Sequence, residues 1–293
     1  MKNHPENDNF RYLDLGNGND EGTVLVVSLN RPRKHNALNA AFWKEIGVLF
    51  RMVGDSPSFR CRCILLLGNG PSFCAGIDIS DPSFLSPFSE SDDGGDPARA
   101  GLRFEPKLKQ MQQAFTEIEL CPVPVVAAMH GFVVGGGIDL VTATQVRLCT
   151  KDTQFAVKEV QLGLAADVGT LQRFPKLSSN QSLVHELCYT GRKFSAQEAL
   201  QLGLVSRVVA SRDDLVRESL QLCYQIARYS PIAVHGTKRA LLYSRDHSVQ
   251  EGLEQIAAFN IMALQSGDTQ KAFMAAAAKE EASFDDIPVR SRL

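Results

Sequence analysis

The distribution of apolar positions changes along the chain. In the first two-thirds, short apolar runs of strand length alternate with longer segments in which apolar residues recur at helical spacing. The strand-like runs lie at residues 23–29, 63–68, 124–131, 146–150 and 154–159. The helical segments lie at residues 39–53 and 103–120, and another begins near Gly136. Strands that alternate with helices predict an α/β core.

The last third has a different pattern. From Asp213 onward almost every segment has helical periodicity. We therefore predict a flexible, polar N-terminal segment at residues 1–21, an α/β core at 22–210 and a C-terminal helical region at 211–293. Residues 80–101 are rich in Ser, Asp, Gly and Pro and are expected to form an exposed loop.

Composition narrows the possible functions. The chain has 293 residues, of which 44% are hydrophobic and 22% are charged, and its formal net charge is -2. Without a block of Lys and Arg it lacks the electrostatic signature of a nucleic-acid-binding protein. No apolar run reaches the roughly 20 residues that a membrane-spanning helix needs. Neither a nucleic-acid partner nor a membrane span is expected.

The cysteine pattern does not indicate a metal site or a disulfide framework. The chain has seven cysteines, and most lie in apolar stretches, which predicts reduced and buried thiols in an intracellular compartment. They are Cys61, Cys63, Cys74, Cys121, Cys149, Cys188 and Cys223. Cys61 and Cys63 form a C-x-C pattern, but no second Cys/His pair stands at metal-ligand spacing. Burial as small hydrophobic residues is favoured over a zinc site.

Two glycine-containing segments follow strand-like runs, SFCAGID at 72–78 and AAMHGFVVGGGID at 127–139. Glycine permits unusual backbone conformations and lets a ligand approach closely. In the second segment a helix begins within the glycines, so its first N–H groups could bind a developing negative oxygen. The alternative is a turn that needs glycine only for packing. The spacing G-x-x-x-G-G-G fits neither a dinucleotide-binding loop nor a P-loop.

These two segments resemble the paired oxyanion-hole motifs of the enoyl-CoA hydratase/isomerase (crotonase) superfamily. The resemblance continues through LNRPRKHNALN, CPVPVVAAMHG, FAVKEVQLGLAADVGTLQR and FSAQEALQLGLVSRVV, and spans about residues 22–280. It implies the α/β crotonase (ClpP-like) fold of repeated ββα units with a C-terminal helical region. It also implies that the N–H groups of Ile77 and Gly136 hold the thioester oxygen of an acyl-CoA, which stabilises the enolate formed by proton removal at the alpha carbon.

Because the superfamily catalyses several reactions, the acid–base groups must decide between them. Asp139, Glu159 and Asp167 each have a structural explanation: a helix first turn, a surface position and a helix N-cap. Together, within this frame, they resemble the dienoyl-CoA isomerases. Hydratases have glutamates at the positions of Asp139 and Glu159, and usually a small or apolar residue at that of Asp167.

Isomerisation of a 3,5-diene to a 2,4-diene removes a proton at C2 and adds one at C6, several bonds away, which calls for two acid–base groups. We expect Glu159 to act at C2 and Asp167 at C6, with a trienolate held by Ile77 and Gly136 between the two transfers. An apolar acyl pocket would raise carboxylate pKa values and allow a neutral acid near pH 7. Asp139 is expected to orient the substrate or tune the pair. The sequence leaves open which of the pair is the first base.

Coenzyme A recognition is expected from two places. By resemblance, Arg33 and Lys34 approach the CoA phosphates, and the backbone around Ala75–Asp78 meets the adenine; solvated surface cations are the alternative. His130 is expected to be structural. No metal or redox cofactor is implied, since CoA is part of the substrate.

Other functions remain open on this fold. A hydratase or a Δ3,Δ2-enoyl-CoA isomerase would not need Asp167. A non-catalytic crotonase-like protein would only bind a partner such as RNA or an assembly subunit, but the intact acids and glycine motifs argue against it.

Assembly and location are also predicted. The resemblance implies a homotrimer or homohexamer. The terminal Ser291-Arg292-Leu293 differs from the peroxisomal S-K-L signal by one basic replacement, and the acid-containing N-terminus is unlike a mitochondrial transit peptide. We expect binding to the peroxisomal import receptor and a peroxisome or related organelle such as a glycosome, in preference to the mitochondrial matrix.

Overall fold

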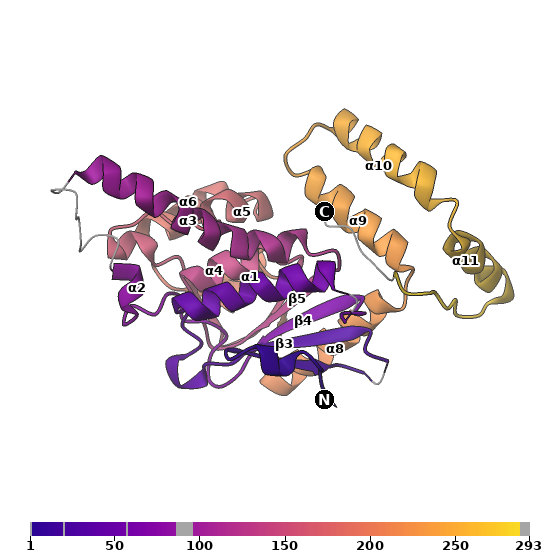
Figure 1. Ribbon diagram of the computed structural model, residues 1–293, viewed down its shortest axis with the longest axis horizontal. Helices are drawn as coiled ribbons and strands as arrows, with labels where there is room; N and C mark the ends of the chain where they lie inside the picture. Colours follow the sequence, from indigo (N-terminus) through magenta and orange to yellow (C-terminus); the bar gives the residue numbers. More distant parts are fainter. Residues whose placement is uncertain (1, 20, 57, 86–95, 288–293) are drawn as a thin grey trace.

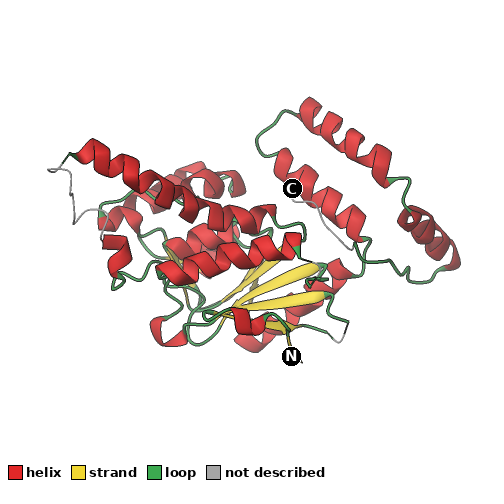
Figure 2. Ribbon diagram, in the orientation of Figure 1, coloured by secondary structure: helices red, strands yellow, loops and turns green. Residues whose placement is uncertain are grey.

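The computed structural model describes residues 2–19, 21–56, 58–85 and 96–287. Figure 1 and Figure 2 show a β-sheet with helices on both sides and a group of helices that extends away from it. The larger sheet has seven strands in the order β1-β2-β3-β4-β5-β7-β10, and a smaller sheet has the order β6-β8-β9. From β3 to β10 neighbouring strands of the larger sheet are parallel, while β1 and β2 pair antiparallel at one edge.

The strands of the larger sheet are β1 (Lys2–Asn3), β2 (Leu13–Asn17), β3 (Val24–Leu29), β4 (Cys63–Gly68), β5 (Val125–Met129), β7 (Val146–Thr150) and β10 (Arg207–Val209). Those of the smaller sheet are β6 (Phe132–Val134), β8 (Gln154–Ala156) and β9 (Phe194–Ser195). The helices up to the last strand are α1 (Ala40–Asp55), α2 (Pro82–Leu85), α3 (Pro97–Leu120), α4 (Gly136–Thr142), α5 (Thr170–Leu177), α6 (Gln181–Thr190) and α7 (Ala196–Gln201). They are followed by α8 (Arg212–Ala227), α9 (Pro231–Tyr243), α10 (Val249–Ala263) and α11 (Gly267–Ala278).

The two faces of the larger sheet carry separate hydrophobic cores. Along β3, Leu25, Val27 and Leu29 pack in one core and Val24 and Val26 in the other, as the two-residue period of a strand requires. The first core includes side chains of α1 and α3, and the second includes side chains of α8, so the sheet is covered on both sides (Figure 1). Burial of both faces explains why the strands read as continuous apolar runs. The predicted α/β core is confirmed.

The prediction of a flexible segment at residues 1–21 is wrong for β2. This strand pairs with β3 along its whole length. Leu13 and Leu15 are buried in the first core, whereas the intervening Asp14 accepts a hydrogen bond from the side chain of Asn30 at 2.8 Å. Two apolar residues in a polar segment are too few for the period-2 pattern to stand out in the sequence.

The loop predicted at residues 80–101 is shorter than expected, because the short helix α2 occupies Pro82–Leu85. α3 already begins at Pro97, and the Asp96 side chain caps it by accepting a hydrogen bond from the backbone N–H of Ala98 at 3.0 Å. Aspartate followed by proline is a recognised helix start. The centre of the predicted loop, residues 86–95, lies outside the described residues.

The boundary predicted at residue 210 also differs from the structure. Leu215, Cys223 and Ala227 of α8 are buried against β4, β5 and β7, so α8 belongs to the core. An apolar stripe has the same period whether it packs on a sheet or on other helices, so the sequence could not assign this helix.

The helices α9 to α11, which we call the limb, extend away from the sheet (Figure 1). The core holds the chain on both sides of the limb. On α9 the buried Lys238 donates hydrogen bonds to the carbonyl oxygens of Cys121 and Val123 at 2.6 and 2.9 Å. Beyond α11, the carbonyl oxygen of Phe284 accepts a hydrogen bond from Arg62, just before β4, at 2.6 Å.

Six of the seven cysteines are buried and Cys188 is half-buried, which confirms the predicted burial of most thiols. In the described part of the chain, no group of three or more His, Cys, Asp or Glu side chains could hold a metal ion. None of the helices described there combines the length and apolar character needed to cross a membrane.

Candidate active site

The two glycine segments meet at the end of the larger sheet. A short parallel bridge joins Cys74 to Val133: the Cys74 N–H donates to the Phe132 carbonyl oxygen at 3.0 Å, and the Val134 N–H donates to the Cys74 carbonyl oxygen at 3.0 Å. Gly76 has φ +88°, and a Cβ atom there would lie only 2.7 Å from the Val134 carbonyl oxygen. Only glycine fits this contact, because both the positive φ and the missing Cβ are needed.

This packing places two backbone amides side by side. A Cβ on Gly76 would lie 3.5 Å from the Gly136 nitrogen, so the Gly136 amide is adjacent to the residue before Ile77. The Leu38 N–H donates to the Gly76 carbonyl oxygen, and the Leu38 carbonyl oxygen accepts from the Asp78 N–H. The N–H of Ile77, between them, is left out of this pairing. Among the described residues, neither the Ile77 N–H nor the Gly136 N–H has an acceptor. Two unpaired donors at one place, one of them at the first position of α4, are chemically suited to stabilise a negative oxygen.

Glu159 lies beside these donors. It begins the short 3-10 helix η4 (Glu159–Leu162), and its Oε1 lies 3.2 Å from the position of a Cβ on Gly135. The side chain is buried and Oε2 has no hydrogen-bond partner. Burial raises the pKa of Glu159, and the charge of Asp167 raises it further, against hydrogen bonds from nearby backbone N–H groups. A buried carboxyl group with a raised pKa, next to two unpaired N–H donors, is suited to proton transfer.

Asp139 is completely buried in α4. Its Oδ1 accepts a hydrogen bond from the backbone N–H of Thr170, the first residue of α5, at 2.6 Å, while Oδ2 has no partner. Burial raises the pKa of Asp139 to about 7, and the charge of Glu159 contributes to the rise. This acid therefore exchanges its proton near neutral pH.

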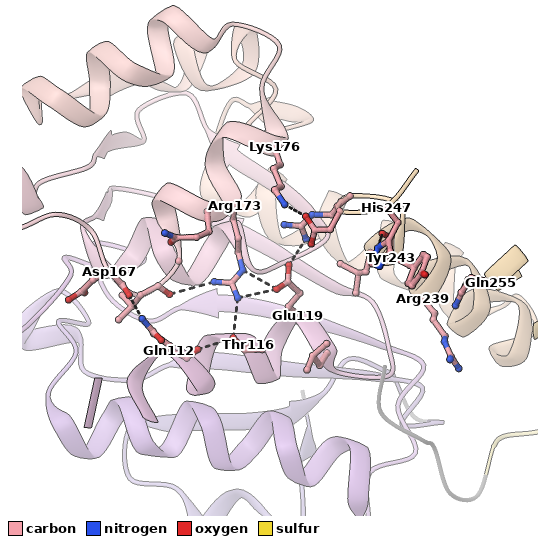
Figure 3. Close-up of a pocket in the computed structure, with 17 residues that line it drawn as sticks. Gln112, Thr116, Glu119, Asp167, Arg173, Lys176, Arg239, Tyr243, His247 and Gln255 are labelled. Atoms are coloured by element: carbon pink, nitrogen blue, oxygen red, sulfur yellow. Dashed lines mark hydrogen bonds and ion pairs between the residues drawn. The ribbon is translucent and has the colours of Figure 1, made fainter. Parts of the chain in front are cut away.

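Asp167 precedes α5 and is exposed in the single chain. Partial desolvation still raises the pKa of its carboxyl group. Its charge acts on both Asp139 and Glu159, so the three acids predicted from the sequence lie close enough to influence one another. Asp167 also lines one end of a cavity of about 720 Å³ that runs to Tyr243 and Gln255 of the limb (Figure 3).

Thr170 was not anticipated from the sequence. Its side chain is completely buried and its Oγ1 has no partner. Together with Asp139 Oδ2 and Glu159 Oε2, it makes a third unpaired buried polar atom in the same region. Most buried polar atoms are paired, so such a group points to a place where a substrate or water binds. A threonine after a glycine gave no signal in the sequence.

The residues predicted to meet CoA lie on two neighbouring loops. The Ala75 N–H donates to the His35 carbonyl oxygen at 2.9 Å, which joins the loop of Arg33 and Lys34 to the first glycine segment. Lys34 reaches Ser80 with its Nζ 3.4 Å from the hydroxyl oxygen. Arg33 and Lys34 are both exposed.

Asp78 has a structural task in this loop. Its carboxylate accepts hydrogen bonds from the Ser80 hydroxyl at 2.6 Å and from Arg31 at 2.7 Å. The hydrogen bond from Ser80, with a further contribution from Arg31, lowers the pKa of Asp78 to about 2 despite partial burial. The side chain is therefore engaged within the protein, and the backbone of Asp78 is engaged too, since its N–H donates to the Leu38 carbonyl oxygen and its carbonyl oxygen accepts from the Asp81 N–H, both at 2.9 Å.

His130 is buried after β5, and its Nε2 lies 2.9 Å from the carbonyl oxygen of Gly70. Burial lowers the pKa of His130, which favours the neutral imidazole. This arrangement agrees with the structural role expected from the sequence.

Comparisons with known proteins agree with the sequence resemblance. The Enoyl-CoA hydratase/isomerase family model matches residues 19–286. The mitochondrial Delta(3,5)-Delta(2,4)-dienoyl-CoA isomerase of Mus musculus is 46% identical over 260 residues, which cover 88% of this chain and 77% of that protein. The peroxisomal Delta(3,5)-Delta(2,4)-dienoyl-CoA isomerase of Arabidopsis thaliana is 38% identical over 277 residues, or 94% of this chain and 98% of that protein.

The fold is shared with solved structures. An enoyl-CoA hydratase from Bacillus anthracis matches with a TM-score of 0.81 and 25% identity, over 94% of this chain and 99% of that one. The predicted crotonase fold is confirmed by this likeness and by the family match.

Proposed function

Because the chain belongs to the enoyl-CoA hydratase/isomerase (crotonase) family, we propose that it is an enzyme that converts 3,5-dienoyl-CoA into 2,4-dienoyl-CoA in the β-oxidation of unsaturated fatty acids. The observation that carries the proposal is the group of three acids, Asp139, Glu159 and Asp167, whose pKa values are all raised. The names of the mouse and plant relatives support it.

The first step is proton removal at C2. In a 3,5-diene C2 is a CH₂ group next to the thioester, so its proton is the acidic one. Glu159, in its ionised form, takes this proton, and the electron pair of the broken C–H bond moves onto the thioester oxygen. The N–H groups of Ile77 and Gly136 stabilise that oxygen, and loss of one such donor typically costs about 10²–10³ in rate.

The second step is protonation at C6. Asp167 starts protonated and gives its proton to C6, while electrons return from the oxygen through the conjugated chain and leave double bonds at C2 and C4. In the balance, C2 loses one proton to Glu159 and C6 gains one proton from Asp167, so the reaction needs no oxidant and no cofactor. Asp167 is exposed, so water can carry the proton that resets the two acids after each turnover.

Asp139 tunes Glu159 in this proposal. A second negative charge in the same buried region would disfavour ionisation of Glu159. With a pKa of about 7, Asp139 holds its proton during much of the time at neutral pH, which leaves Glu159 free to ionise. The three acids titrate as a coupled group.

The test uses 3,5-octadienoyl-CoA with ultraviolet detection of the conjugated 2,4-product. We expect rapid product formation by the native chain and large losses in Glu159→Gln and Asp167→Asn. Asp213→Asn, at an exposed aspartate at the start of α8, is the matched control and should keep full rate. Hydration of a 2-enoyl-CoA or a single-bond Δ3,Δ2 shift, unaffected by Asp167→Asn and without any 2,4-diene, would overturn the proposal.

Recognition of CoA is part of the same proposal. Arg33 and Lys34 would pair with its phosphates, and the backbone of Ala75–Asp78 would meet the adenine. Support comes from the hydrogen bonds that join these two loops beside the oxyanion pocket and from the exposure of both cations.

Assembly into a homotrimer or homohexamer is supported by exposed apolar side chains on and around α10 and α11. These are Leu253, Ile261, Met262, Leu264, Phe273 and Met274. Apolar surface of this extent commonly marks a contact between proteins.

For location, the two relatives above are mitochondrial and peroxisomal. We favour the peroxisome or a related organelle, reached through the import receptor, because the sequence ends in Ser291-Arg292-Leu293. These three residues lie outside the described part of the chain. Removal of the three residues from a fluorescent fusion should abolish organelle import.

A further inference from the structure

The loop that carries Asp167 is anchored by the buried side chains of Ala166 and Val168, and two polar side chains also hold its backbone. Gln112 on α3 donates from Nε2 to the Asp167 carbonyl oxygen at 2.7 Å. Arg173 on α5 lies with Nη1 3.5 Å from the Val168 carbonyl oxygen. Neither contact engages the Asp167 carboxylate, so both can fix its position without reducing its ability to exchange a proton.

Arg173 occupies the space under the loop. Its side chain is buried, and a Cβ on Gly169 would overlap Arg173 Nη1. Gly169 also has φ +136°, a conformation that strongly favours glycine. The loop and the guanidinium are therefore fitted to each other, and the position of one determines the position of the other.

Arg173 is held in turn by a chain of charges (Figure 3). It pairs with Glu119 Oε2 on α3 at 3.0 Å and donates to the Thr116 hydroxyl at 3.2 Å. The other oxygen of Glu119 pairs with Arg245, which follows α9 of the limb. Burial acts to raise the pKa of Glu119, but Arg173 and Arg245 outweigh it and lower the pKa, so Glu119 is ionised at neutral pH.

Among the described residues, Glu159, the acid proposed to act at C2, has no such connection to the limb. Glu159 stands on η4 against Gly135, on the side of the oxyanion pocket. The cavity of about 720 Å³ borders the Asp167 loop, Arg173 and Arg245, so the loop has open space on that side (Figure 3). Beyond the packing of Ala166 and Val168 in the first core, its placement depends on the contacts with Gln112 and Arg173.

We propose that Arg245, Glu119 and Arg173 form a positioning relay that holds the Asp167 loop, so that the start of the limb controls proton delivery at C6 and leaves proton removal at C2 unaffected. This inference rests on the proposed function. Within the described part of the chain none of the three bonds to Glu159, and we assign them as positioning residues that act through the backbone at positions 167–169.

The test separates the two proton transfers. The native chain and Arg245→Gln are incubated with 3,5-octadienoyl-CoA in D₂O; deuterium at C2 of recovered substrate is measured by mass spectrometry, and 2,4-product by ultraviolet absorbance. Since a misplacement of about 1 Å can cost about 10²-fold, we expect isomerisation to fall about tenfold or more while C2 exchange stays within about twofold. Arg245→Lys should recover part of the loss.

Two further variants keep the result decisive. Gln112→Leu removes the other contact of the loop without leaving a buried charge, and it should shift the ratio of exchange to isomerisation in the same direction. Arg207→Gln, on β10, breaks an ion pair with Glu218 of α8 at the surface and should leave the ratio unchanged.

The outcomes separate the inference from the function. If exchange and isomerisation fall in parallel in Arg245→Gln and Gln112→Leu, or if neither changes, the relay is refuted while the isomerase proposal stands. If the native chain forms no 2,4-diene, the proposed function itself fails.

Discussion

Replacement of Asp139 by asparagine probes the electrostatics of the buried acids directly. The pKa of this group rises from 3.8 to about 7 on folding, so between these values the folded protein keeps a proton that the unfolded chain releases. The unfolded state then binds fewer protons, and the free energy of unfolding falls as pH rises. Over the whole range, from below pH 3.8 to above about pH 7, the free energy of unfolding falls by about 4 kcal/mol. About 2.5 kcal/mol of this fall takes place between about pH 5 and about pH 8.

Asparagine removes this pH-dependent loss. Its carbonyl oxygen can still accept the hydrogen bond from the Thr170 N–H, while its amide NH₂ replaces an oxygen that has no partner. The unpaired NH₂ adds a pH-independent cost of about 1–3 kcal/mol. The informative quantity is therefore the change with pH in the stability difference between the native chain and Asp139→Asn.

Urea unfolding at the two pH values measures that change. We expect the variant to gain about 2.5 kcal/mol on the native chain between about pH 5 and about pH 8. Asp213→Asn, at an exposed position, should show no such gain. A stability difference for Asp139→Asn that is equal at both pH values would refute the reasoning, since it would mean that Asp139 has no raised pKa.

Three further predictions concern other parts of the site. Gly76→Ala introduces a Cβ 2.7 Å from a backbone oxygen and should lower kcat by about 10²-fold or more, whereas Gly101→Ala, with open space around the new atom, should keep full activity in the same assay. Glu119 has a lowered pKa, so its ion pairs stabilise the fold above about pH 4.5 and this contribution is lost as pH falls through the lowered value; Glu119→Gln should flatten the acid limb of a stability–pH curve. Arg33→Gln combined with Lys34→Gln should raise KM for the acyl-CoA, with little change in kcat, in steady-state kinetics at low salt.

The sequence predicted those parts of the fold whose signals are local. The buried strands, α1 and the glycine turns each have a short pattern. The meeting of the two glycine segments follows from that pattern, whereas the oxyanion role of Ile77 and Gly136 stays a prediction. β2 escaped because it contributes only two core residues, Leu13 and Leu15.

The polar connections of the site could not be predicted, because they join residues far apart in the chain. Glu119 lies 54 residues before Arg173 and 126 before Arg245, and no periodicity relates them. The catalytic assignments of Asp139, Glu159 and Asp167 came from a family resemblance, and they stay predictions until variants are measured. The burial that raises their pKa values is visible only once the chain is folded.

The limb has a consequence for the behaviour of a cleaved chain. Lys238 and Arg245 fasten its beginning to the core, and Arg62 fastens the chain again at Phe284. A protease that cuts between α10 and α11 would therefore produce two fragments that each keep an anchor. We expect the nicked protein to elute at its original size under native conditions and to separate into two pieces only in denaturant, so an intact elution profile is no proof of an intact chain.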